Sequence, residues 1–168
     1  MYYLDILSIL STMPTTKIVL VGNSRVGKSS FVERLHGAFH SSYAPTLGSE
    51  VFPLTRKGKR SNLWDLGCSP ALAGPGDMYF VEADVAAVFF SLVDSASFSA
   101  ARGWSERVRE VSPGAQVALV GTHLDAPRRT VSEEDISALS ADIGASVFLI
   151  SSATGEGVEK LAAAFAAM

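Results

Sequence analysis

Cysteine, long apolar runs and massed positive charge are all scarce in this chain of 168 residues. The one cysteine, Cys68, excludes an intrachain disulfide and fits a reducing compartment, so we expect a protein of the cytoplasm or nucleus. Lys and Arg number 14 against 17 Asp and Glu, for a net charge of −3, and they are scattered along the chain. This balance gives no electrostatic support to a nucleic-acid partner, and any phosphate-bearing ligand should be small.

The two ends of the chain carry no evident membrane anchor. Residues 1–10 are apolar but too few to span a bilayer, and no positive charge precedes them as in a secretory signal. Some of them have helical spacing, so a short amphipathic helix and an unstructured extension both stay open. The residues with this spacing are Tyr3, Ile6, Leu7 and Leu10. Residues 163–168 contain no cysteine for prenylation, and we expect no lipid anchor.

What the chain has in quantity is apolar material for a core. Hydrophobic residues make up 48% and charged residues 18%, without a low-complexity tract. This composition indicates a globular fold rather than disorder, at a length typical of one domain. We expect an extension at residues 1–15, flexible or a short helix, and one domain at residues 16–168.

Residues 22–29 spell G-x-x-x-x-G-K-S directly after the apolar run at 17–21, the pattern of a phosphate-binding loop. Glycine at both ends allows a tight turn in which backbone N–H groups and the N-terminus of the following helix surround phosphate oxygens. Lys28 adds a positive charge, and the Ser29 hydroxyl can ligate Mg²⁺. The residues expected to contact a nucleotide here are Gly22, Asn23, Ser24, Arg25, Val26, Gly27, Lys28, Ser29 and Ser30.

Apolar runs and helical patterns alternate along the rest of the chain. Strands are expected at 17–21, 85–93, 116–121 and 145–150, a hairpin at 50–54 and 60–66, and helices at 30–36, 97–111, 131–143 and 157–167. Ser95 or Ser97 is the expected cap of the helix at 97–111. The alternation predicts an α/β fold, with a mostly parallel six-stranded sheet, one antiparallel edge strand and helices on both faces.

Short polar motifs fall beside the expected strand ends, where ligands of such sheets bind. They are Tyr43-Ala44-Pro45-Thr46-Leu47-Gly48, Asn62-Leu63-Trp64-Asp65, Thr122-His123-Leu124-Asp125 and Ser152-Ala153. In order and position they resemble the motifs of small GTPases of the Ras superfamily, over nearly the whole chain from about Thr16. The resemblance implies a P-loop NTPase G domain that binds GTP or GDP with Mg²⁺.

The resemblance also implies a role for each motif. Ser29 would ligate Mg²⁺, and the Thr46 hydroxyl would complete the Mg²⁺ shell when the γ-phosphate is present. Asp65 would hold the metal, usually through water.

On the base side, the Asp125 carboxylate would accept from the ring N–H and exocyclic amine of guanine, a donor pair that adenine lacks. The backbone at Ser152 and Ala153 would meet the guanine oxygen, and Phe39 would pack against the base.

Within the superfamily the chain is most similar to the Ran branch, with the Rab branch as the alternative. The run Y-A-P-T-L-G-S-E-V-F-P-L at 43–54 and Trp104 are Ran-like features. Gly22-Asn23-Ser24 and the segment 151–158 look more like Rab. The Ran likeness implies nucleocytoplasmic transport as the setting.

The sequence departs from the family motif D-T-A-G-Q, which here reads Asp65-Leu66-Gly67-Cys68-Ser69. Cys68 replaces the glycine whose N–H contacts the γ-phosphate. Ser69 replaces the glutamine that orients the attacking water and is too short to reach the same position. With Lys28, Thr46 and Ser69 as the catalytic candidates, we expect slow or absent GTP hydrolysis.

Further departures concern affinity. Thr122 replaces an asparagine, a change that the Rho branch of the superfamily tolerates. His123 replaces a lysine whose stem covers the base, so a lowered nucleotide affinity is expected. Arg25 stands where glycine is common, and it either lies over the phosphates or points into solvent. Thr154 follows Ala153 where the family has lysine.

Three hypotheses follow. In the first, the protein is a monomeric GTP/GDP switch that meets effectors or transport factors through its two switch segments. In the second, it binds GTP without hydrolysing it and acts as a decoy or scaffold for Ran or Rab partners. The third is a small-molecule kinase, which would need an arginine-rich lid, for which Arg128-Arg129 is the candidate pair.

Overall fold

The computed structural model describes residues 14–37, 46, 48–67 and 76–168. Its centre is a six-stranded sheet in the order β2-β3-β1-β4-β5-β6. Neighbouring strands are parallel, except that β2 runs antiparallel to β3 at the edge. The strands are β1 (Thr15–Val21), β2 (Ser49–Arg56), β3 (Lys59–Leu66), β4 (Val85–Ser91), β5 (Gln116–Thr122) and β6 (Ser146–Leu149). The predicted fold class is confirmed.

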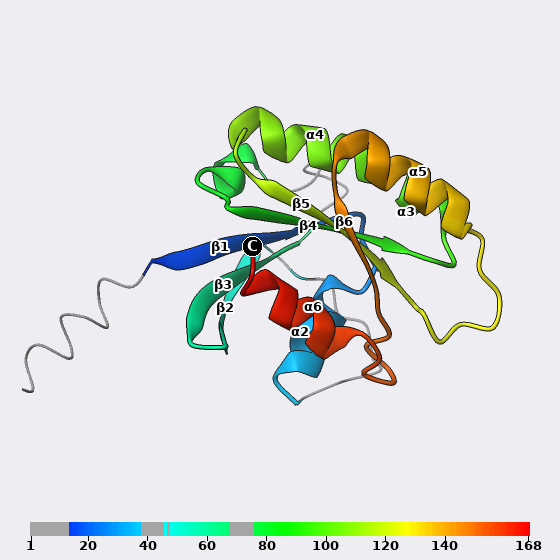
Figure 1. Ribbon diagram of the computed structural model, residues 1–168, viewed down its shortest axis with the longest axis horizontal. Coiled ribbons are helices and arrows are strands. Elements are labelled where there is room, and N and C mark those ends of the chain that lie inside the picture. Colours follow the sequence, from blue (N-terminus) through cyan, green and yellow to red (C-terminus); the bar gives the residue numbers. More distant parts are fainter. Residues whose placement is uncertain (1–13, 38–45, 47, 68–75) are drawn as a thin grey trace, which may run out of the picture.

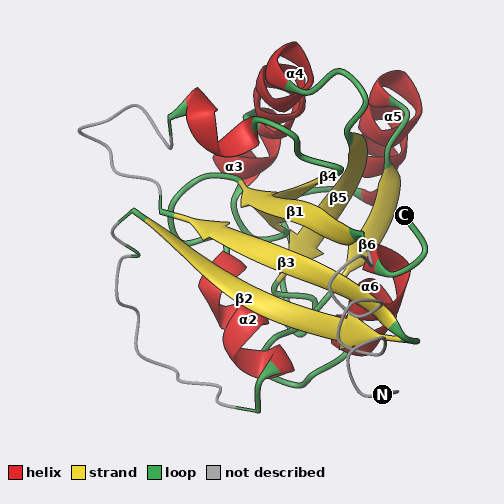
Figure 2. Ribbon diagram, turned by 90° about the vertical axis from the view of Figure 1, so that its left-hand side faces the viewer, coloured by secondary structure: helices red, strands yellow, loops and turns green. Residues whose placement is uncertain are grey.

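Helices cover both faces of the sheet, with α2 and α6 on one side and α3, α4 and α5 on the other (Figures 1 and 2). The helices are α2 (Lys28–Leu35), the 3₁₀-helix η2 (Asp77–Phe80), α3 (Ser95–Ser99), α4 (Ala101–Val111), α5 (Glu133–Ile143) and α6 (Val158–Phe165). Within the described residues, no helix has the length and apolar character needed to cross a bilayer.

The period-two alternation of the strands builds two cores from one sheet. In β1, Ile18 packs in the core beneath α2 and α6, whereas Val19 packs in the core beneath α4 and α5. Phe89 of β4 lies 5.6 Å from the ring of Phe31 in α2, and its neighbour Phe90 lies 5.1 Å from Phe98 in α3. Both faces of the central strands are therefore buried, which explains their continuously apolar sequences.

The expected single helix at 97–111 is wrong. The structure has two helices, α3 and α4, separated at Ala100. The expected cap at Ser95 or Ser97 is also wrong, because the Asp94 carboxylate accepts from the N–H groups of Ala96 and Ser97. The Ser97 hydroxyl instead donates to the Asp94 carbonyl and accepts from Ser91 N–H, which ties α3 to the end of β4.

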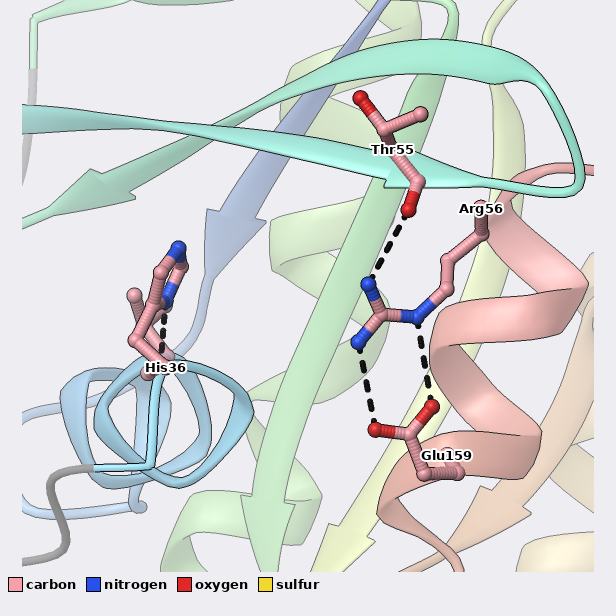
Figure 3. A network of polar contacts seen from close by, with 5 residues as sticks. His36, Thr55, Arg56 and Glu159 are labelled. Carbon is pink, nitrogen blue, oxygen red and sulfur yellow. Dashed lines mark hydrogen bonds and ion pairs between the residues drawn. The ribbon is translucent and has the colours of Figure 1, made fainter.

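The edge hairpin is longer than expected, with β2 and β3 joined through Lys57 and Gly58 at φ 51° and 75°. Positive φ at two central residues is the geometry of a tight hairpin turn. Arg56 at the end of β2 holds α6, with Nε and Nη2 donating to Glu159 at 3.3 and 3.2 Å (Figure 3). The hairpin is therefore linked to α6 by an ion pair.

Candidate functional site

The loop between β1 and α2 has a backbone that requires glycine at its first residue. Gly22 has φ 136°, and a Cβ there would overlap the carbonyl oxygen of Phe89. Gly27, at φ 89°, precedes α2, and no side chain caps the helix. The N–H groups of the first turn of α2 therefore face the loop, as an anion-binding helix N-terminus requires.

Lys28 lies inside this loop rather than in solvent. Its side chain is buried, with 7% relative exposure, and Nζ donates to the carbonyls of Gly22 and Asn23 at 3.1 Å each. The Asn23 side chain in turn accepts from the indole N–H of Trp104 in α4 at 3.0 Å. A buried ammonium bordered by backbone N–H groups is an arrangement that binds phosphate oxygens.

Three oxygens from separate segments meet beside Lys28. The Ser29 hydroxyl donates to Asp65 Oδ2 at 2.5 Å, and Ser29 Oγ lies 2.9 Å from Thr46 Oγ1. Asp65 ends the β3 stretch beside β1 and is 2% exposed. Burial raises the pKa of its carboxyl, and the Ser29 hydrogen bond and the Lys28 charge oppose that rise.

These oxygens fit Mg²⁺. Two oxygen ligands that lie at right angles around Mg²⁺, each 2.0–2.1 Å from the ion, are about 2.9 Å from each other. The oxygens of the Ser29 and Thr46 hydroxyls are also 2.9 Å apart. Asp65 Oδ1 is buried without a hydrogen-bond partner among the described residues, so it has a free lone pair for a bound water or ion. No group of three or more His, Cys, Asp or Glu in the described residues offers another metal site.

Gly67 is a site residue that the sequence analysis did not single out. Its N–H donates to the Gly48 carbonyl at 2.8 Å, and a Cβ on Gly67 would overlap the Thr46 carbonyl oxygen. Glycine at this position therefore allows the Thr46 carbonyl to lie against the end of β3. The signal in the sequence was a glycine directly after the apolar strand that carries Asp65.

The base side begins at Thr122, at the end of β5. Its hydroxyl lies 2.8 Å from the Val26 carbonyl and 3.1 Å from the Phe90 carbonyl, so it joins the phosphate-binding loop to the strand ends. His123 has φ 60°, and its Nδ1 lies 2.9 Å from Ser91 Oγ and 3.0 Å from Thr122 Oγ1. The His123 ring is therefore held on one nitrogen while the residue remains exposed.

Asp125 and the loop after β6 lie together because β5 and β6 are neighbours. A hydrogen bond from the buried Ser151 hydroxyl is the main cause that lowers the pKa of the Asp125 carboxyl. Leu124 N–H also donates to the Ile150 carbonyl at 3.1 Å. The carboxylate is therefore ionised at neutral pH and able to accept hydrogen bonds from a ligand.

The structure brings most of the predicted site residues to one edge of the sheet. Ser24 and Arg25 are exposed at the loop tip, and Ser30 lies in the first turn of α2. Ser152 and Ala153 follow β6 beside Asp125. Phe39, Cys68 and Ser69 lie outside the described residues.

The comparison with known families agrees with this geometry. The model of the Ras family matches residues 17–167. This chain belongs to the Ras family. The match runs from β1 to the residue before the last, so the Ras-family domain includes the phosphate-binding loop, the Asp65 strand end and the Asp125 loop. The predicted superfamily is thereby confirmed, and the chain is a GTP-binding small GTPase domain.

Proposed function

We propose that this Ras-family protein is a Ran-like switch that binds Mg·GTP or Mg·GDP and hydrolyses GTP slowly. The observation that carries the proposal is the meeting of the Ser29 and Thr46 hydroxyls with Asp65 beside the buried Lys28. This set joins a phosphate-binding loop to a metal site, and Asp125 offers a carboxylate for guanine on the other side.

Each residue has a separate task in this proposal. Lys28 and the N-terminus of α2 bind phosphate oxygens and orient the terminal phosphate. Ser29, Thr46 and Asp65 would hold Mg²⁺, which when bound supplies positive charge to the phosphates. Because Thr46 comes from the segment before β2, its position responds to the terminal phosphate, and an ordered Thr46 marks the GTP state.

Slow hydrolysis follows from residue 69. A glutamine there would orient the attacking water, and a serine side chain ends too early to do so. Cys68 retains the backbone N–H of the family glycine but restricts its conformations. The protein would therefore remain in the GTP state for longer than a relative with glutamine.

A single-turnover measurement of GTP hydrolysis tests this account, with the wild type, Ser69→Gln and Ser69→Leu compared. Leucine is similar in size to glutamine but has no amide to orient water. We expect Ser69→Gln to raise the rate at least about tenfold and Ser69→Leu to leave it low. An equal rate in all three proteins would overturn the missing-glutamine explanation.

A second candidate function is a fixed-state scaffold for Ran or Rab partners. One observation favours it, because the Thr46 hydroxyl lies 2.9 Å from the Ser29 hydroxyl and glycine at residue 67 allows the Thr46 carbonyl to approach the end of β3. A switch whose threonine moves little between GDP and GTP would present one surface to its partners. Equal effector binding by the GDP-loaded and GTP-loaded proteins would favour the scaffold over the switch.

The setting is also part of the proposal. A monomer in the cytoplasm or nucleus would meet effectors or transport factors through the segments around Thr46 and after Asp65. No nucleic-acid partner or lipid anchor is proposed.

The kinase alternative is weaker. Arg129 donates to the Leu124 carbonyl at 3.0 Å and lies 3.9 Å from Glu133, so it is engaged within its own loop. Preferential binding of ATP over GTP would favour the kinase.

A further inference from the structure

Arg34 connects the phosphate side of the site to the base side. It lies in the last turn of α2, the helix whose N-terminus faces the phosphate-binding loop. Its Nη2 donates to the carbonyl of Ala153 at 2.6 Å, in the loop after β6. A short hydrogen bond from a guanidinium is stronger than a neutral one and fixes the orientation of the carbonyl that accepts it.

The loop after β6 is shaped to receive this guanidinium. Gly155 has φ 89°, and a Cβ on it would lie 3.3 Å from Arg34 Nε and 3.4 Å from Nη2. A side chain at residue 155 would therefore be strained by its backbone and crowded by Arg34. Glycine allows the loop to lie against the arginine.

The same loop is closed by Ser151. Gly155 N–H donates to the Ser151 carbonyl at 2.8 Å, and Thr154 N–H donates to Ser151 Oγ at 3.1 Å. The Ser151 hydroxyl is also the main cause of the lowered pKa of the Asp125 carboxyl. Arg34 thus contacts the same turn that carries Ser151, the residue that acts on Asp125.

Two N–H groups of this turn are free for a ligand. Neither Ser152 N–H nor Ala153 N–H donates to another residue in the described part of the chain. A base with an oxygen acceptor next to a ring N–H would engage this turn and the Asp125 carboxylate together, and guanine is such a base.

We propose that Arg34 is a positioning residue for guanine recognition, acting through Ala153. It holds the 151–155 turn at the place where the free N–H groups meet the guanine oxygen while Asp125 meets the ring N–H and the amine. The proposal rests on the guanine-nucleotide function above and adds a residue that itself contacts no nucleotide. It also couples base recognition to α2, because a displacement of that helix would move the turn.

Competition binding against a fluorescent GDP analogue tests the proposal on the full chain, with GDP and ADP as competitors. Arg34→Ala is expected to raise the GDP dissociation constant about tenfold, because a turn without its guanidinium contact adopts the binding arrangement in a smaller fraction of the molecules. The ADP dissociation constant should not change, because adenine offers no oxygen to the turn. Arg34→Lys, which retains the charge but not the planar fork, should give an intermediate GDP value.

Arg128→Ala is the matched control, since it removes an exposed arginine from the neighbouring base-side loop. An Arg34→Ala protein that binds GDP as the wild type does would overturn the proposal. So would an equal loss of GDP and ADP affinity, which indicates a general structural role for the charge at the end of α2. If Arg34→Ala does not fold, Arg34→Lys alone decides, and wild-type GDP binding by Arg34→Lys overturns the proposal. A wild-type protein that binds no guanine nucleotide would instead overturn the proposed function itself.

Discussion

The phosphate half and the base half of the site are built in different ways. On the phosphate side, Lys28 and Asp65 are buried, and the backbone of Gly22 is possible only for glycine. On the base side, His123 and Asp125 are exposed and are held by side chains of other elements. The phosphate half is therefore fixed by backbone and burial, whereas the base half depends on contacts between side chains. Departures from the family motifs occur at Thr122, His123 and Thr154 on the base side, and also at Arg25, Cys68 and Ser69.

The largest effect is expected from a substitution at Gly22, in the phosphate half. In Gly22→Val the new side chain overlaps the Phe89 carbonyl at a backbone angle that valine rarely adopts. We expect a loss of about 3 kcal/mol in the free energy of unfolding and no measurable GDP binding. Gly114→Ala, at an open position, is the control for urea denaturation and should remain close to the wild type. Normal GDP binding by Gly22→Val would contradict the loop geometry.

Asp125→Ala tests the base half directly. Removing the carboxylate leaves the guanine N–H donors without an acceptor, so the preference for GDP over ADP should fall about a hundredfold. Because the residue is exposed, the free energy of unfolding should change little. The measurement is competition binding with both nucleotides. An unchanged preference for GDP over ADP would mean that residues other than Asp125 recognise guanine.

Removal of Mg²⁺ should affect the phosphate half of the site independently of the base half. Chelation of Mg²⁺ by EDTA should speed GDP release roughly tenfold or more, because the phosphates lose a positive charge that Lys28 alone does not replace. Stopped-flow release of a fluorescent GDP analogue measures this. Asp125→Ala should respond to EDTA by the same factor as the wild type, since the metal and the base are read by separate residues. A GDP release rate that does not change with EDTA would mean that Ser29 and Asp65 do not form a metal site.

Gly67→Ala tests a backbone contact within the phosphate half. The added methyl group overlaps the Thr46 carbonyl and should displace the Thr46 hydroxyl. We expect Mg²⁺ affinity in the GTP-loaded protein to fall about tenfold, the scale on which supporting groups act on metal sites. Metal titration of nucleotide release measures the change. An unchanged midpoint would mean that Thr46 is held by other contacts.

The smallest expected effect concerns Ser151 and acid stability. The pKa of Asp125 is lowered mainly by the Ser151 hydrogen bond, so the native protein binds this proton less tightly than the unfolded chain. The stabilisation is complete above the ordinary carboxyl pKa and is lost as the pH falls through the lowered value. Ser151→Ala should therefore unfold at a slightly higher pH in an acid titration followed by circular dichroism. The effect is small because Asp125 is exposed, and the exposed Ser137→Ala should show none.

The sequence was sufficient for the parts that depend on local pattern. The apolar strands, the G-x-x-x-x-G-K-S loop and the order of the elements were predictable because each depends on residues that are close together in the sequence. Contacts between distant residues were not predictable. Arg34 meets Ala153 across 119 positions, and the importance of Gly67 depends on a carbonyl from another segment. The helix cap at Ser95 or Ser97 was wrongly predicted because Ser97 bonds the end of β4 and Asp94 caps α3 instead.

The identity of the nucleotide released by denaturing freshly purified protein tests the account most directly, by ion-exchange chromatography. The account predicts near-stoichiometric guanine nucleotide, with GTP prominent because Ser69 cannot orient the attacking water. GDP alone would support the guanine-nucleotide site but contradict slow GTP hydrolysis. Adenine nucleotide, or a protein that carries none and binds no added GDP, would contradict the central claim that these residues form a guanine-nucleotide site.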